Sequence, residues 1–592
     1  MRTNKLIHYT TRLLAMLALT AAIQPAQGTT LIRNARIFDG DAVIESASVV
    51  IRDGRIATIA ATPKTVPEGA PEVDATGMTL IPGLIDSHTH SWGTAPREAL
   101  NFGVTTVLDM FTEPTLAANW RLEQRAGPVP DRADVFSAGV LVTVAGGHGT
   151  QFGIDIPTLD DPDDTEAFVA ARIAEGSDYI KIIHEAGSAR RRFPTFGGKQ
   201  LQRIVAAAHG GDRLALVHVG TAEGAGMAIA AGADGLMHVY RDPGDTDLVA
   251  AIRARGTFVV PTLAVVESMF GSSNPDALAA DPLISDYLSA NAEANLKRSF
   301  TQGTNPAGMG AALGNVRALF EAGVPILAGS DAANPGVTHG ASLHRELELL
   351  AQAGMPNIDV LRAATSNAAD AFRLHDRGRV AEGKKADLVL VRGDPLQDLA
   401  TTRDIVGIWK DGVRFERQRR DRSARRPPHE PRMLGAFDTG TDVAESGWVP
   451  STDSLAGGKS TVELSLVAAT EARGGALRIQ GDNARGYAYP WSGAMVNLGS
   501  SMMQPVNLGG IRKLAFDARG EDKRYRAMAF AESLGQMPAI VEFNASAEWQ
   551  RVEIPLTGFP GFDPQGAMAF FIGSPGDVGT FWLEIDNVEL VE

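Results

Sequence analysis

The chain has 592 residues, of which 44% are hydrophobic and 21% are charged, and it contains no cysteine. This length is several times the ~150 residues of a typical domain, so it predicts a large domain with at least one accessory domain. The balanced composition excludes a mainly disordered or collagen-like chain. The formal net charge of -15 disfavours nucleic acid as a partner, because its phosphates are repelled by a surface of the same sign.

The first 28 residues have the pattern of a secretory signal peptide. Basic residues precede an apolar run from Leu13 to Ile23, and Ala26 and Gly28 are the small residues expected at a signal-peptide cleavage site. A run of about eleven apolar residues covers only about half the ~20 that a membrane-spanning helix needs, so we expect cleavage and no integral membrane span. Without cysteine, neither disulfide bonds nor a lipid-modified amino terminus can form. We therefore expect a periplasmic or secreted protein.

Short strand-like segments stand on both sides of the central part of the chain. Residues 29–80 alternate apolar runs with turn signals such as Asp53-Gly54, and residues 376–415 have the same character. We expect these two segments to join into one small β-sandwich domain, with the central domain inserted between them.

The central residues 81–375 alternate apolar runs of strand length with alanine-rich helical stretches. Nearly continuous apolar strands are typical of a parallel sheet that is buried on both faces. The repeated strand-helix units predict an α/β fold of the (β/α)8 TIM-barrel type, with an open doubly wound sheet as the alternative. The strands are expected within residues 80–90, 104–110, 135–142, 179–183, 214–218, 235–240, 257–263 and 324–331.

The C-terminal part of the chain predicts a linker followed by an all-β domain. Residues 416–432 are rich in arginine and contain Pro427-Pro428, a pattern typical of a solvated linker. Residues 433–592 contain many short alternating runs, which indicate a β-sandwich. Their length and final strand resemble the galactose-binding-like jelly rolls of complex I intermediate-associated proteins. This domain is a candidate to bind a glycan or a protein partner through its aromatic residues, although aromatics in a sandwich more often belong to the core: Trp448, Tyr487, Tyr489, Trp491 and Trp549.

Two histidines close the first barrel strand. Because side chains alternate along a strand, His88 and His90 point to the same side, which we expect to be the mouth of the barrel. Two imidazoles on one side can share a metal ion, but the spacing alone is a weak signal.

A lysine stands in the middle of the fourth apolar run. Lys181 would be desolvated there, which disfavours its charged form and lowers its pKa. A partly neutral amine can react with carbon dioxide to form a carbamate, whose two oxygens can bridge two divalent ions. The alternative is a lysine that extends to the surface from the strand end.

Two further strands end in histidine, and the last strand ends in a carboxylate. His218 and His238 follow neighbouring strands separated by one short helix, so both arrive at the same end of the barrel. Asp331 ends the last strand, at the rim where barrel active sites gather. Each histidine alone would more often belong to the core, but together with the first-strand pair they indicate a metal centre.

These motifs resemble the amidohydrolase superfamily, and within it the imidazolonepropionase-like enzymes and the Xaa-Pro dipeptidases. The resemblance covers about residues 30–415 and is carried by residues 82–90, 180–182, 329–331, 363–369 and 383–389. It implies two divalent metal ions, with zinc as the expected metal. His88, His90 and Asp331 would hold the more buried ion, His218 and His238 would hold the more exposed one, and a carbamate formed from carbon dioxide on Lys181 would bridge them.

The resemblance also implies a reaction. A hydroxide that bridges the two ions would attack the carbonyl of a small dipeptide or N-acyl amino acid, and Asp331 would carry the proton to the leaving nitrogen. The alternative is ring opening or deamination of a cyclic amide or heterocycle, which typically needs one ion and makes Lys181 less important. A third alternative is an inactive barrel used for binding. The metal content separates the first two.

Further residues are candidates to contact the substrate. A substrate carboxylate could be held by His148, which resembles a substrate-contacting histidine of the dipeptidase branch, by Tyr240, or by the run Arg190, Arg191 and Arg192. Solvated arginines are the simpler interpretation of that run. His184-Glu185 follows the lysine strand where small residues are common in the family, so no named dipeptide is predicted. A homo-oligomer remains an open alternative.

Overall fold

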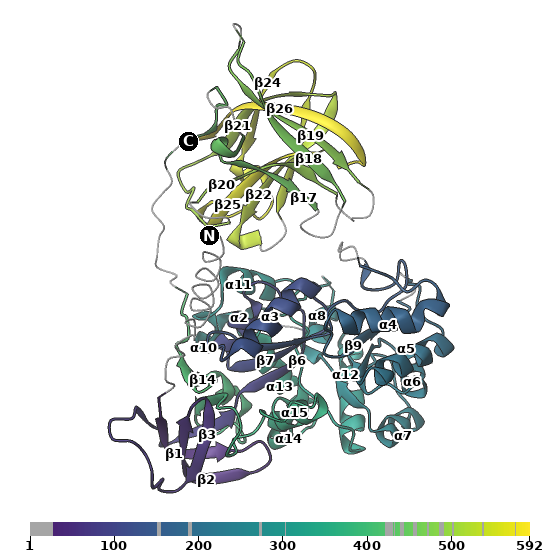
Figure 1. Ribbon diagram of the computed structural model, residues 1–592, viewed down its shortest axis with the longest axis vertical. Coiled ribbons are helices and arrows are strands. Elements are labelled where there is room, and N and C mark those ends of the chain that lie inside the picture. The colour runs from purple at the N-terminus through teal and green to yellow at the C-terminus, as the bar shows by residue number, and fades with distance from the viewer. Residues whose placement is uncertain are drawn as a thin grey trace, which may run out of the picture.

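The computed structural model describes residues 28–150, 156–187, 192–271, 275–301, 303–420, 430, 432–438, 443–453, 459–470, 473–484, 490–499, 503–534, 538–574 and 576–592. The predicted signal peptide, apart from Gly28, lies outside these residues. Among the described residues, no helix has both the length and the apolar character needed to cross a membrane. The chain forms a barrel with a small sheet beside it and a separate β-sandwich, which lies at the top of Figure 1.

The small sheet contains strands from both sides of the barrel sequence. Its strands follow the order β15-β14-β13-β5-β1-β2-β3, with β4 paired to β1. The two flanks meet where β5 pairs antiparallel with β13, with Leu80 opposite Leu390. As predicted, the barrel is therefore inserted into a β-domain. The bounds are β1 (Thr30–Phe38), β2 (Val43–Arg52), β3 (Arg55–Ala60), β4 (Glu72–Asp74), β5 (Met78–Pro82), β13 (Leu388–Arg392), β14 (Ile405–Lys410) and β15 (Val413–Phe415).

Parallel strands form the predicted (β/α)8 barrel. β6, β7 and β8 pair in that order, as do β9, β10, β11 and β12. Val142 bridges to Ile182 between the two groups, and Ile326 bridges to Val259. The last segment closes the barrel, since Ser87 N donates to Ala328 O at 2.9 Å and Asp331 N donates to His88 O at 2.8 Å. The bounds are β6 (Leu84–Thr89), β7 (Val104–Asp109), β8 (Asp134–Ser137), β9 (Ile180–Ile183), β10 (Ala215–His218), β11 (Gly235–Met237) and β12 (Phe258–Val260).

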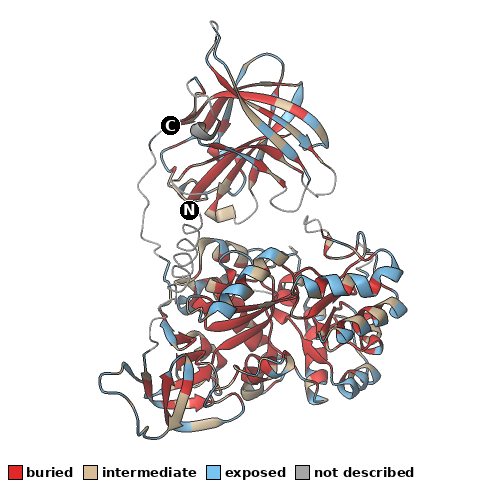
Figure 2. Ribbon diagram, viewed as in Figure 1, coloured by how far each residue is buried: buried red, intermediate tan, exposed pale blue. Residues whose placement is uncertain are grey.

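Amphipathic helices surround the barrel. In α5 the apolar residues Leu201, Ile204, Val205 and Ala208 recur at helical spacing and are buried, while the outer face is polar. Figure 2 shows the same division, with buried strands inside and exposed outer helix faces. The bounds are α2 (Ala95–Asn101), α3 (Pro114–Ala126), α4 (Thr165–Ala174), α5 (Gly198–Gly210), α6 (Ala222–Ala231), α7 (Thr246–Arg255), α8 (Leu263–Met269), α9 (Pro275–Ala280), α10 (Pro282–Ser285), α11 (Ala290–Leu296), α12 (Pro306–Glu321), α13 (Ala341–Gln352), α14 (Asn357–Ala363) and α15 (Ser366–Ala371).

A buried ion cluster joins the barrel to the small sheet. Lys410 Nζ, on β14, lies 3.2 Å from Asp134 Oδ1 on β8 and 2.9 Å from Asp411 Oδ2. Arg377 Nη1 lies 2.7 Å from the other oxygen of Asp134. Although burial opposes it, the positive charges of Lys410 and Arg377 hold the pKa of Asp134 below its ordinary value. The negative charges of Asp134 and Asp411 are therefore neutralised by cationic side chains of the protein itself.

The C-terminal residues form a sandwich of antiparallel sheets. One sheet has the order β18-β19-β26-β21-β24, with β16 paired to β26, and the other has the order β17-β20-β25-β22-β23. Trp448 is buried in the core, where its indole donates to Leu434 O at 3.0 Å, whereas Tyr487 and Tyr489 lie outside the described residues. The bounds are β16 (Met433–Gly435), β17 (Trp448–Thr452), β18 (Thr461–Val467), β19 (Ala476–Asn483), β20 (Ser492–Asn497), β21 (Lys513–Gly520), β22 (Lys523–Ala531), β23 (Ala539–Ala545), β24 (Gln550–Pro555), β25 (Ala567–Gly573) and β26 (Gly579–Val591).

The first residues of the predicted linker are packed against the barrel. The Arg417 guanidinium lies 3.5 Å from the ring centroid of Tyr287. Gln418 N donates to Asn101 Oδ1 at 2.8 Å, and Arg420 Nη1 lies 2.8 Å from Glu293 Oε2. Arginines that the sequence suggests are solvated are thus partly held by aromatic and acidic partners on the barrel. Residues 421–429 and 431 lie outside the described part of the chain.

Candidate metal centre

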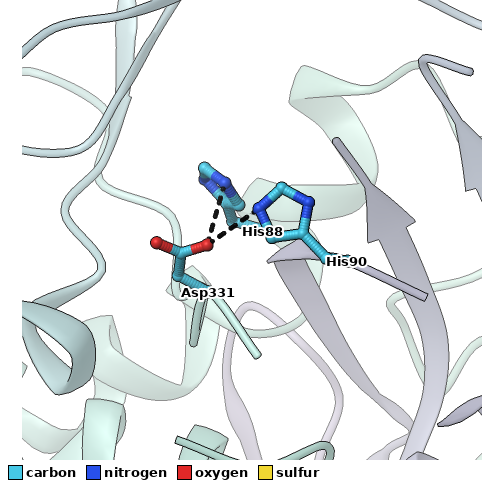
Figure 3. A group of neighbouring side chains, drawn as sticks. All are labelled: His88, His90 and Asp331. Atoms are coloured by element: carbon cyan, nitrogen blue, oxygen red, sulfur yellow. Dashed lines mark ion pairs between the residues drawn. The ribbon is translucent and has the colours of Figure 1, made fainter. Parts of the chain in front are cut away.

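His88, His90 and Asp331 meet at the mouth of the barrel (Figure 3). Asp331 Oδ1 lies 3.4 Å from His88 Nε2 and 3.1 Å from His90 Nε2. The two histidines stand two positions apart at the end of β6, and alternation along the strand directs both to the same side. Asp331 follows the barrel's last segment, whose backbone is bonded to that of His88. Barrel closure therefore creates this cluster.

Lys181 points into the barrel from β9. Its side chain is buried, and Nζ lies 3.5 Å from His88 Nε2. Burial lowers the pKa of Lys181 to about 7, although the carboxylates of Asp331 and Asp109 oppose this shift. At neutral pH a substantial fraction of this amine is therefore uncharged.

His218 and His238 complete the cluster from β10 and from the residue that follows β11. Their ring centroids are 4.4 Å apart, and the His238 centroid lies 4.7 Å from that of His88. Burial lowers the pKa of His218 to about 4 and that of His238 well below its ordinary value. Neutral imidazole is the form that binds metal ions. The structure thus brings all the predicted metal ligands together at one end of the barrel.

A hydrogen-bond partner outside this cluster orients the imidazole of His238, and an acidic side chain lies near that of His218. His238 Nδ1 lies 2.6 Å from Thr262 Oγ1, which leaves Nε2 of the same ring for another ligand. His218 Nε2 lies 3.7 Å from Glu185 Oε2. A hydrogen bond at the second ring nitrogen, as His238 has, is typical of metal-binding histidines, because it fixes the tautomer and the ring orientation.

The backbone is strained at three residues of the site. His238, Thr262 and Asp331 have φ values of +75°, +51° and +59°, in the left-handed region that residues other than glycine rarely adopt. Residues in this region cluster at functional sites, where the surrounding structure holds them.

Asp86, a buried carboxylate that we did not single out in the sequence, lies next to the cluster and connects two of its strand segments. Asp86 accepts hydrogen bonds from Ser330 N at 2.9 Å and Ser330 Oγ at 2.6 Å, and thereby ties β6 to the last strand segment. Burial raises the pKa of Asp86 to about 7. Its position two residues before His88, on the same side of the strand, was a signal that could have revealed it.

The predicted substrate contacts have different outcomes. The His148 ring centroid lies 4.8 Å from that of His218, so His148 reaches the site. Tyr240 is buried and packs beside Gly244, and its hydroxyl has no hydrogen-bond partner within the described residues. Arg192 is exposed, whereas Arg190 and Arg191 lie outside the described residues. Arg241, which the sequence did not single out, lies near the site, with Nη2 3.6 Å from Glu185 Oε2.

Comparisons with known proteins agree with this geometry. The model of the amidohydrolase family matches residues 79–414. Ochratoxinase from Aspergillus niger is 25% identical over 314 residues, which cover 48% of this chain. The matched part spans 60% of the length of ochratoxinase.

Two further relatives match over nearly their whole length. Imidazolonepropionase from Cereibacter sphaeroides is 26% identical over 384 residues, covering 61% of this chain and 91% of that protein. The solved structure of a Xaa-Pro dipeptidase with bound methionine in its active site is 25% identical, with a TM-score of 0.53, covering 66% of this chain and 100% of that one. Because the family model spans more than half of the sequence, this chain belongs to the amidohydrolase family.

Proposed function

We propose that this protein is a metal-dependent hydrolase that cleaves the amide C–N bond of a small dipeptide or N-acyl amino acid. The observation that carries the proposal is the convergence of four imidazoles, one carboxylate and one desolvated amine at the mouth of the barrel. Barrel enzymes carry their active sites at this end.

The residues present fit a pair of divalent ions. Asp331 Oδ1 is buried and has no hydrogen-bond partner within the described residues, although two imidazole nitrogens lie within 3.4 Å of it. Burying a carboxylate oxygen without a partner costs free energy. A cation held by His88, His90 and Asp331 would supply the missing partner. Nitrogen and carboxylate ligands of this kind suit zinc. His218 and His238 would hold a second ion.

Lys181 would join the two ions only after modification. Its ammonium form offers no acceptor, whereas the uncharged amine, favoured by a pKa of about 7, can add carbon dioxide. The reaction would release one proton and leave a carbamate whose single negative charge is shared by two oxygens. The carbamate is part of the proposal and supplies the negative charge that a pair of divalent cations needs.

Asp331 would move the proton. The bound metal ions would polarise the substrate carbonyl and lower the pKa of water. Asp331 Oδ2, the oxygen that is not directed toward His88 and His90, would accept a proton from the attacking water and return it to the leaving nitrogen. Removing this carboxylate should therefore stop turnover.

Relatives support more than one substrate class. Ochratoxinase and a Xaa-Pro dipeptidase favour an amide or dipeptide substrate, and we propose that class first. Imidazolonepropionase matches over 91% of its length, which favours ring opening of a cyclic amide as the second candidate. We also propose that the protein is exported, on the basis of the N-terminal pattern.

One assay tests the proposal. Zinc-loaded protein would be incubated with a library of dipeptides, N-acyl amino acids and cyclic amides, with Asp331→Asn as the control for catalysis. We expect the wild-type protein to hydrolyse dipeptides or N-acyl amino acids and the Asn variant to be inactive. Hydrolysis of cyclic amides alone would replace the first candidate with the second, and near-normal kcat in the Asn variant would refute the role of Asp331.

A further inference from the structure

Glu185 and Arg241 form an ion pair beside the imidazole of His218. Glu185 Oε2 lies 3.6 Å from Arg241 Nη2 and 3.7 Å from His218 Nε2. Glu185 comes shortly after β9, and Arg241 comes shortly after β11. Because β10 pairs with both of these strands, the ion pair spans the end of β10 next to the candidate metal centre.

Gly220 provides the space for this ion pair. A Cβ atom at position 220 would lie 2.1 Å from Glu185 Oε2 and 2.6 Å from Arg241 Nη2. Gly220 also binds the backbone of Arg241, since Gly220 O accepts a hydrogen bond from Arg241 N at 3.2 Å. A residue with any side chain at this position would displace the two charged groups.

The Arg241 guanidinium retains donors for a ligand. A guanidinium has five N–H donors, and Glu185 is the only ion-pair partner of Arg241 within the described residues. The contact is longer than a hydrogen bond, and 24% of the Arg241 side chain is exposed against 8% of the Glu185 side chain. Glu185 is itself held in place, since its Oε1 accepts from Gly187 N at 2.7 Å.

We propose that Arg241 binds the carboxylate of the substrate and that Glu185 positions the Arg241 side chain. This inference rests on the proposed function and identifies the subsite for the free carboxylate of a dipeptide or N-acyl amino acid. A guanidinium suits that group, because its planar fork matches the two oxygens of a carboxylate.

The location of Arg241 suits the dimensions of such a substrate. In an N-acyl amino acid, only one nitrogen and one Cα separate the scissile carbonyl carbon from the carboxylate carbon, a span of roughly 3–4 Å. Arg241 contacts the same carboxylate oxygen of Glu185 that faces His218. A ligand held by Arg241 would therefore lie near His218, one of the candidate metal ligands.

Arg192 is a competing arginine. It lies in the loop after β9 and is exposed, with its backbone bridged to Gly187. An exposed arginine loses more side-chain entropy when it binds an anion, and its charge is screened by water. Arg241 is more buried and already positioned, so it is better suited to bind one carboxylate in a defined place.

The test compares an N-acetyl amino acid that the protein hydrolyses with the same compound amidated at its carboxylate. Arg241→Gln is expected to raise KM for the carboxylate form about 10- to 100-fold and to leave the kinetics of the carboxamide within about twofold. Gly220→Ala should have the same selective effect while it retains both charges. Arg192→Gln and the distant Arg213→Gln serve as matched controls and should leave the preference for the carboxylate unchanged.

The role of Glu185 requires a separate readout, because it also contacts His218. In Glu185→Gln we expect KM to rise for the carboxylate form alone, whereas any change in kcat should be equal for both compounds. Glu185→Asp should restore part of the difference in KM. Equal changes in KM for both compounds would show that Glu185 acts only on His218.

A binding measurement separates this inference from the proposed function. Isothermal titration calorimetry uses the metal-loaded, inactive Asp331→Asn protein and an N-acetyl amino acid, and adding Arg241→Gln to this background should weaken binding at least tenfold with unchanged metal content. If the wild-type protein hydrolyses neither compound, the proposed function fails, and the calorimetry still decides whether Arg241 binds carboxylates. Equal affinity with and without Arg241→Gln in the Asp331→Asn background, or loss of the preference in Arg192→Gln alone, would overturn the inference.

Discussion

Nζ of Lys181 lies 3.5 Å from Nε2 of His88, inside the barrel. Both groups are cationic when protonated, and burial lowers the pKa of each, the lysine to about 7 and the histidine well below its ordinary value. At neutral pH the histidine is therefore neutral and the lysine is partly so. The uncharged forms of both nitrogen groups can take part in metal chemistry, whereas two cations at this distance would repel each other.

Replacing Lys181 tests its proposed role. In Lys181→Ala we expect bound zinc to fall from about two ions per chain to about one, because the bridging ligand is lost. Elemental analysis after dialysis measures this ratio. Lys199→Ala, which changes an exposed lysine on α5, should keep the wild-type content. An undiminished zinc content in Lys181→Ala would show that the carbamate is not needed and would favour the one-ion alternative.

The contact between Thr262 and His238 should affect metal affinity. Thr262→Val retains the shape of the side chain but removes the hydroxyl that lies 2.6 Å from His238 Nδ1. We expect zinc affinity to fall about 10- to 100-fold, as is typical when the hydrogen-bond partner of a metal-binding histidine is removed. Competition with a chromophoric chelator measures the affinity. Thr262→Ser retains the hydroxyl and should bind zinc nearly as the wild type does, so equal losses in both variants would contradict this account.

Glu346 should make stability depend on pH. Its side chain is buried on α13, Oε2 accepts from Ala264 N at 2.8 Å, and burial raises its pKa to about 8. Between its ordinary pKa and pH 8 the folded state holds a proton that the unfolded state has lost. The contribution of Glu346 to the free energy of unfolding is therefore complete below its ordinary pKa. Above that pKa it decreases by up to about 1.4 kcal/mol per pH unit, and it is lost once the pH has risen through 8.

Replacing Glu346 with glutamine should remove this dependence while keeping an acceptor for Ala264 N. Urea unfolding at pH 6, 7, 8 and 9 should therefore give a flatter stability profile in Glu346→Gln than in the wild type. Glu321→Gln, at the exposed end of α12, should retain the wild-type profile. The same slope in the wild type and in Glu346→Gln would assign the pH dependence to other groups.

Lys410 should contribute strongly to the stability of the folded chain. Its side chain is completely buried and lies among Asp134, Asp387 and Asp411. Lys410→Met leaves these carboxylates without a central cation, which typically destabilises a protein by about 3–5 kcal/mol. Urea unfolding measures this difference, with Lys199→Met as the exposed control. A loss below about 1 kcal/mol would show that Arg377 and Lys385 compensate the carboxylates without Lys410.

Much of the barrel and its ligand positions could be predicted from the sequence. Strand alternation places His88 and His90 on one side, and parallel strands bring His218 and His238 to the same end, so local patterns suffice. The last strand position is also predicted from its apolar run, although there Ile326 makes an isolated bridge to Val259 instead of belonging to a regular strand.

Contacts between distant loops could not be predicted in this way. The pairing of Glu185 with Arg241 depends on the missing Cβ of Gly220, which no periodicity reveals. Likewise, a run of arginines does not indicate which of them finds an aromatic partner, as Arg417 does on Tyr287. Such contacts arise only once separate segments of the chain are brought together.

The pairing of β5 with β13 has a consequence for synthesis on the ribosome. Leu80 and Leu390 face each other across this pair, although some three hundred residues separate them along the chain. The amino-terminal strands emerge first, and the open edge of β5 must wait for the whole barrel to be translated. An unpaired strand edge can associate with other chains, so the edge of β5 that β13 covers stays open to such pairing until β13 has been synthesised.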